Sequence, residues 1–201
     1  AYPYHLHTYL PQNTEMLFVW SFLLKSEMAA ALLNWGFLVA LLSLTIGFLS
    51  RATGVLPALC AAFIILSAPI CAGYSVTLKN DLPAAALLFA HYCALIRAVD
   101  LKSAGDPSAA RWALLCGIFL GGAAGHKLNA LFVGAPTVLA VIAFDFHQRK
   151  KQPGVRALAL VLLLGAAVPS VPWFARTAWA TMPRVRLTLK SGTVFVTNYS
   201  A

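Results

Sequence analysis

Charged residues are scarce in this chain of 201 amino acids, and acidic residues are the scarcest. Asp, Glu, Lys and Arg together make up 10% of the sequence, whereas a soluble domain usually carries about 25%. Only 6 residues are acidic, while hydrophobic residues reach 60% and fall in long blocks rather than at amphipathic spacing. These deficits argue against a water-soluble domain and indicate an integral membrane protein.

The motifs of soluble enzymes are also missing from the sequence. The five histidines show no metal-binding spacing such as HExxH, and neither a Ser-His-Asp pattern nor a phosphate-binding glycine loop is present. The net charge of +9 comes without a basic stripe interleaved with aromatics, which argues against nucleic-acid binding. No CxxC pair occurs, and all four cysteines lie in apolar surroundings typical of small buried residues: Cys60, Cys71, Cys93 and Cys116.

The apolar blocks predict an all-α integral membrane protein with about six transmembrane helices and one short interfacial helix. Backbone polar groups must be paired within the bilayer, so each long block is expected to be helical. Asn13 or Thr14 would cap the interfacial helix, from Glu15 to about Leu24, which is too short to span. The expected spans are residues 28–49, 55–72, 82–98, 112–126, 128–146 and 157–174.

We interpret residues 1–201 as a single transmembrane domain and part of a longer chain, because the sequence opens without Met and stops abruptly. Residues 175–201 read as a basic tail without a further span. In the fourth span, Gly117, Gly121 and Gly125 recur at small-xxx-small spacing, which predicts close packing against another helix.

The basic loops set the expected orientation. The densest cluster, within residues 149–156, is expected on the cytoplasmic side, which leaves residues 1–25 outside. The outer face still carries many cations, and these indicate either an anionic ligand or contact with lipid headgroups. The outer basic residues are Lys25, Lys79, Lys127, Arg176, Arg184, Arg186 and Lys190.

Three ionisable residues at the edges of apolar blocks are functional candidates, because charge near the hydrocarbon region is costly. Glu15 opens the interfacial helix and Asp81 opens the third span. Each is either a first-turn acid favoured by the helix dipole or a carboxylate with a chemical role. Lys127 interrupts the apolar run between the fourth and fifth spans, where it either snorkels to the interface or holds a phosphate as a point charge.

Several short motifs follow one another along the chain: Tyr4-His5-Leu6, Leu10-Pro11-Gln12-Asn13-Thr14-Glu15-Met16-Leu17-Phe18, Asp81, Gly125-His126-Lys127, Pro172-Trp173-Phe174-Ala175-Arg176 and Ser191-Gly192-Thr193-Val194-Phe195. In order and spacing, this series resembles the bacterial membrane glycosyltransferases of the C superfamily. These are relatives of protein O-mannosyltransferases and aminoarabinose transferases, similar to glycosyltransferase family 39. The superfamily has a first catalytic Asp just before its Tyr-His-Leu segment, a position upstream of this chain.

The resemblance implies an inverting glycosyltransferase that uses a polyprenyl-phosphate-linked sugar at the outer face of the inner cell membrane. Asp81 and Glu15 would be its catalytic carboxylates, with one acting as general base on the acceptor hydroxyl. A divalent ion, Mg²⁺ or Mn²⁺, or basic residues would stabilise the departing phosphate. The expected substrate-binding residues are Lys127, Lys79, His5 and Arg176.

Two other functions stay open. A non-catalytic membrane subunit would keep a diverged glycosyltransferase fold and pack against other subunits of a larger membrane complex. A transporter would show paired helix breaks, but only Gly125-His126-Lys127 reads as a break, so this function ranks last. The catalytic hypothesis requires Glu15, Asp81 and Lys127 to converge on one outer cavity, and separate faces would contradict it.

Overall fold

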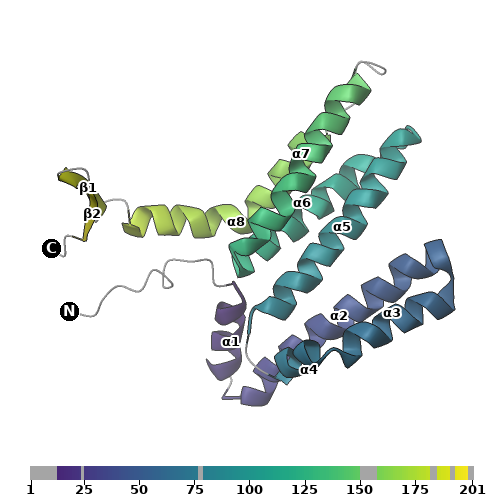
Figure 1. The fold of residues 1–201 in the computed structure, drawn as a ribbon, viewed down its shortest axis with the longest axis horizontal. Helices are drawn as coiled ribbons and strands as arrows, with labels where there is room; N and C mark the ends of the chain where they lie inside the picture. Colours follow the sequence, from purple (N-terminus) through teal and green to yellow (C-terminus); the bar gives the residue numbers. More distant parts are fainter. Residues whose placement is uncertain are drawn as a thin grey trace.

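The computed structural model describes residues 13–23, 25–76, 79–149, 158–181, 185–190 and 193–198. Helices dominate this part of the chain, which confirms the predicted fold class (Figure 1). A two-stranded antiparallel hairpin, β1 (Val185–Lys190) and β2 (Thr193–Asn198), follows the last helix and was not foreseen in the basic tail. The helices are α1 (Asn13–Leu23), α2 (Glu27–Thr53), α3 (Val55–Ser67), α4 (Pro69–Val76), α5 (Asp81–Ser103), α6 (Ala109–His126), α7 (Asn129–Arg149) and α8 (Leu158–Thr181).

Four stretches of helix in the described chain are long and apolar enough to cross a membrane: Met28–Thr53, Asp81–Ser103, Asn129–His147 and Leu158–Arg176. The second expected span is divided, because Ala68 precedes a proline and adopts an extended backbone with ψ of 122°, which ends α3. α6 has 18 residues but includes Arg111 and His126 near its ends. The multi-pass membrane character is therefore clear, while the count of six spans stays a prediction.

Helix α6 lies at the centre of the bundle, with α5 on one side and α8 on the other (Figure 1). α2 packs against α5, and α3 and α4 return along α2. α5, α6 and α7 run in alternating directions, so the start of α5 and the junction of α6 with α7 meet at one end. We call this the Asp81 end and the opposite one the Arg97 end. In the predicted orientation, the Asp81 end faces outward.

Glycines bring α6 and α8 into backbone contact. A Cβ added to Gly117 would collide with the carbonyl oxygen of Leu162, and one added to Gly121 would collide with that of Ala166. Gly165 of α8 is equally close to the backbone of α6. The small-residue spacing in the sequence therefore predicted this packing correctly.

Buried polar side chains tie the helices together away from the Asp81 end. His91 of α5 is fully buried, with Nδ1 3.0 Å from the carbonyl oxygen of Cys116 and Nε2 2.8 Å from the hydroxyl of Thr137. Near the Arg97 end, Lys102 donates to Asp145 Oδ1 at 2.5 Å, and Asp145 Oδ2 accepts from the amide of Ala159 at 2.7 Å. These contacts join α5 to α6, α7 and α8.

Candidate active site

Three segments that are far apart in the sequence meet at the Asp81 end: α1, the start of α5 and the junction of α6 with α7. Asn80 connects all three. Its side-chain amide donates to Glu15 Oε1 at 2.9 Å and to the carbonyl oxygen of His126 at 3.0 Å. Asn80 stands at the N-cap of α5, yet its side chain makes no capping bond. The amide is used for contacts between helices instead.

Asp81 and Lys127 form an ion pair between Oδ1 and Nζ at this end of the bundle. Asp81 is the first residue of α5, where the helix dipole favours a carboxylate. Lys127 is the extended residue that separates α6 from α7, with φ of −151° and ψ of 123°. The two side chains remain 31% and 38% exposed, respectively, so the pair is reachable from outside the protein.

His126 links α1 to the end of α6 through a side-chain hydrogen bond. Its Nδ1 atom is hydrogen-bonded to the hydroxyl of Thr14, and both side chains are buried. The His126 ring also meets the ring of Phe37 edge-on, with centroids 6.1 Å apart. Because Glu15 follows Thr14 on α1, this anchoring holds the Glu15 carboxylate beside Asn80.

One oxygen of Glu15 has no partner. Oε1 accepts from Asn80, but Oε2 is buried without a hydrogen-bond partner among the described residues. A buried carboxylate oxygen is costly to leave unpaired, so an unpaired one calls for a specific explanation, of which a catalytic role is one. The cluster of Glu15, Asn80, Asp81 and Lys127 therefore combines a paired carboxylate, an unpaired carboxylate oxygen and a cation.

The other expected substrate-binding residues lie outside this network. Lys79 is exposed and its Nζ lies over the ring of Tyr74, 5.1 Å from the centroid. Arg176 is exposed on α8 with its guanidinium 5.1 Å from the centroid of the Trp173 ring. No hydrogen bond or ion pair joins either to the cluster within the described chain. His5 lies outside the described residues.

Comparison with known proteins gives one finding that bears on this cluster. Residues 54–173 match the model of the dolichyl-phosphate-mannose-protein mannosyltransferase family. The chain belongs to this family. No curated protein and no solved structure matches it significantly. The matched segment contains Asp81 and Lys127, whereas Glu15 precedes it and Arg176 follows it.

Family membership makes the chain a membrane glycosyltransferase-like protein, as the ordered motifs predicted. The divalent ion stays a prediction. No group of three His, Cys, Asp or Glu side chains gathers within the described residues, and Lys127 already pairs with Asp81. A metal held by Asp81 and Glu15 would need further ligands from the substrate phosphate.

The sequence singled out the three charged members of this cluster, Glu15, Asp81 and Lys127. It did not indicate the uncharged residues that hold them together. Asn80 carries no charge and was not among the candidates, and Thr14 was expected to cap a helix. His126 was seen as part of a helix break. An N-cap asparagine normally bonds its own helix, so nothing in the sequence signalled that Asn80 would reach across to α1 and α6.

Proposed function

We propose that this chain is the membrane core of an inverting glycosyltransferase that takes its sugar from a polyprenyl phosphate at the outer face. The convergence of Glu15, Asp81 and Lys127 at one end of the bundle carries the proposal. Asn80 links Glu15 to the start of α5, where Asp81 pairs with Lys127. Family membership supports glycosyl transfer as the reaction class, and the cluster contains the carboxylates and the cation that this reaction needs.

The donor phosphate is expected to compete with Asp81 for Lys127. A lysine ammonium binds phosphate as a point charge, and the pair is exposed enough for a ligand to reach it. When Lys127 moves to the phosphate, the Asp81 carboxylate loses its partner and is available to the acceptor hydroxyl. Donor binding would thus free Asp81 to act as the general base.

The transfer step then follows from the charges. Asp81 takes the proton of the acceptor hydroxyl as the acceptor oxygen attacks the anomeric carbon, on the side opposite the phosphate. The bond from that carbon to the phosphate oxygen breaks, and polyprenyl phosphate leaves with the electron pair. Lys127 stabilises the charge on the leaving phosphate. The unpaired Oε2 of Glu15 is suited to accept a hydrogen bond from the acceptor or the sugar.

An apolar cavity supports a lipid-linked donor. A cavity of about 340 Å³ lies between α6, α7 and α8, and its walls include Ala124 and Leu131. These two residues lie three positions before and four positions after Lys127 in the sequence. A prenyl chain placed there would leave its phosphate near the Lys127 ammonium.

Transfer from dolichyl-phosphate mannose to an acceptor peptide, measured with the purified protein in detergent, tests the proposal. Asp81→Asn should lower kcat by about 10²- to 10⁴-fold, the range for loss of a general base. Lys127→Met should raise KM for the donor by about 10-fold or more, as expected for a lost charge-assisted contact. Asp106→Asn, a fully exposed carboxylate at the other end, is the matched control and should transfer normally.

Unchanged transfer by Asp81→Asn would remove Asp81 from the mechanism. Absence of transfer from every polyprenyl-phosphate sugar, by a folded wild-type protein, would favour the non-catalytic subunit instead. Glu15→Gln separates the two carboxylates: it should reduce acceptor binding while the donor still binds.

A further inference from the structure

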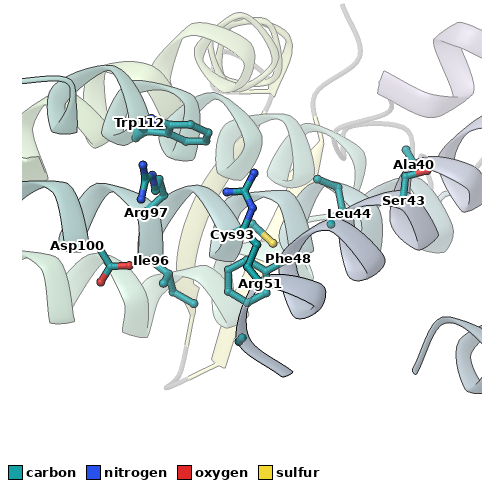
Figure 2. Close-up of a pocket in the computed structure, with 12 residues that line it drawn as sticks. Ala40, Ser43, Leu44, Phe48, Arg51, Cys93, Ile96, Arg97, Asp100 and Trp112 are labelled. Carbon is teal, nitrogen blue, oxygen red and sulfur yellow. The ribbon is translucent and has the colours of Figure 1, made fainter. Parts of the chain in front are cut away.

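A second cavity, larger than the one beside the active site, opens at the Arg97 end. It occupies about 820 Å³ between α2, α5 and the start of α6. Its walls are mostly apolar and include Leu44, Phe48 and Ile96 (Figure 2). It lies at the opposite end of α5 from Asp81, so the proposed reaction does not use it.

Two arginines line this cavity. In Figure 2 the side chains of Arg51 and Arg97 both point toward the side where Trp112 lies. Both arginines are exposed, and neither forms an ion pair within the described chain. Asp100 also lines the cavity, but in Figure 2 its carboxylate points away from the Arg97 guanidinium.

Asp106 is the other carboxylate near Arg97, and it already accepts a hydrogen bond from the backbone. Its Oδ1 accepts from the amide of Ser108 at 2.8 Å, and this bond, more than the charge of Arg97, holds its pKa below the usual range. The charge of Asp106 acts on Arg97 only at a distance, and neither guanidinium group forms an ion pair with a carboxylate of the described residues. An apolar groove with two such cations at its mouth is complementary to an amphipathic anion.

We propose that this cleft binds one anionic glycerophospholipid from the leaflet at the Arg97 end. Arginine matches the geometry of phosphate oxygens, so Arg51 and Arg97 hold the phosphate. The acyl chains lie along Leu44, Phe48 and Ile96. Trp112 stands at the headgroup level, the depth that tryptophan favours in membranes. Because α2 carries Arg51 and α5 carries Arg97, the lipid joins two helices whose ends are otherwise separated by the cleft.

Native mass spectrometry of the purified protein, titrated with phosphatidylglycerol, measures the tightest lipid site. A basic residue near an anionic lipid surface contributes about 1 kcal/mol, so Arg51→Gln or Arg97→Gln should weaken that site by about fivefold. The double variant should weaken it by about 25-fold. Arg111→Gln is the matched control: this arginine is exposed near the same end but does not line the cleft, and binding should stay within twofold.

Glycine substitutions on α2 test the acyl-chain groove independently of charge. Gly47 lines the cleft, and nothing lies within 4 Å of an added Cβ, so the side chain of Gly47→Leu starts in open space and extends into the groove. It should abolish the tight site while the unfolding temperature is maintained. Gly36→Leu makes the same change on an open, exposed part of the same helix and should bind lipid normally.

Three results would overturn the proposal. The first is equal affinity of the Arg51→Gln/Arg97→Gln variant and the wild type. The second is equal binding of phosphatidylcholine, since a neutral lipid needs no pair of arginines. The third is displacement of phosphatidylglycerol by glycerol 3-phosphate at the same concentration, which would make the ligand a free phosphate rather than a lipid.

Discussion

Two lysine–aspartate pairs stand at opposite ends of this bundle, and each includes one residue of α5. Lys102 and Asp145 are almost completely buried, with side chains 5% and 6% exposed. Lys127 and Asp81 are 38% and 31% exposed. The residue types are the same, so the difference in environment separates their roles.

The buried pair is suited to hold helices in place. Asp145 binds the Lys102 ammonium with one oxygen and the amide of Ala159, near the start of α8, with the other. The ring of Phe144 lies 5.9 Å from the Lys102 ammonium. A substrate has no path to these groups. The interaction between Lys127 and Asp81 is weak because the pair is exposed to solvent. Lys127 can therefore exchange Asp81 for a ligand.

Removing one partner of the buried pair is the strongest test of the difference between the two pairs. Asp145→Ala leaves the Lys102 ammonium buried without its counter-ion and also removes the acceptor of the Ala159 amide. Loss of one partner of a buried pair costs about 3–5 kcal/mol of unfolding free energy. Thermal unfolding in detergent would show this as a large fall in the midpoint.

Lys102→Met/Asp145→Leu is the control for that experiment, because it removes both charges together. Most of the lost stability should return, since an apolar replacement of both partners is often close to neutral. If the double variant is as unstable as Asp145→Ala, the penalty comes from packing or from the lost acceptor of the Ala159 amide, and not from an uncompensated charge.

Packing between α6 and α8 should have the next largest effect. Gly117→Ala places a methyl group against the carbonyl oxygen of Leu162, so the two helices must move apart. Overpacking of this kind costs about 1–3 kcal/mol. Gly36→Ala adds the same methyl group where nothing lies within 4 Å, and its midpoint should not fall. Equal midpoints for the two variants would contradict the close contact.

Reversing the exposed pair should alter stability little and chemistry greatly. Asp81→Lys/Lys127→Asp keeps opposite charges side by side, and an exposed pair contributes about 1 kcal/mol or less. Transfer activity should nevertheless disappear, because the base and the phosphate-binding cation have exchanged places. The same reversal of Lys102 and Asp145 should unfold the protein, because an ammonium would then face the Ala159 amide. A reversed outer pair that still transfers sugar would contradict the proposed roles.

The smallest effect is expected at Asp106, a carboxylate that is exposed and pairs with a backbone amide. The hydrogen bond from Ser108 lowers its pKa in the folded state below the usual 3.8. Its contribution to stability is therefore present above pH 3.8 and is lost as the pH falls through the lower folded value. Asp106→Asn should be slightly less stable at pH 7, and the difference should vanish in acid. A constant difference between pH 7 and pH 3 would show that ionisation is not involved.

Most helices could be predicted from the sequence, because long apolar blocks have no other stable form in a bilayer. α2 and α7 begin within one residue of the expected spans, and α1 is close to the expected interfacial helix. The second span was predicted as continuous, although Pro69 forces an extended residue before it and divides the block. The β1–β2 hairpin was missed, since the tail was judged only by its lack of a span.

The candidate site was predicted in part. Ionisable residues at the edges of apolar blocks are rare, and this rarity singled out Glu15, Asp81 and Lys127. Lys102 and Asp145 escaped notice, because each lies near the end of a predicted span and resembles an ordinary loop charge. The same applies to Arg51 and Arg97, which also lie near the ends of predicted spans.

The sequence by itself determined that this protein is helical, spans a membrane several times and carries three candidate charges at the edges of its helices. Composition and block length suffice for that, because lipid excludes unpaired backbone and unpaired charge. The tertiary structure decided which charges meet. It joined Asp81 to Lys127 and Lys102 to Asp145, buried one pair and exposed the other. The partners of these pairs lie 46 and 43 positions apart in the sequence, so their pairing and burial depend on how the helices pack, a relation that no local pattern contains.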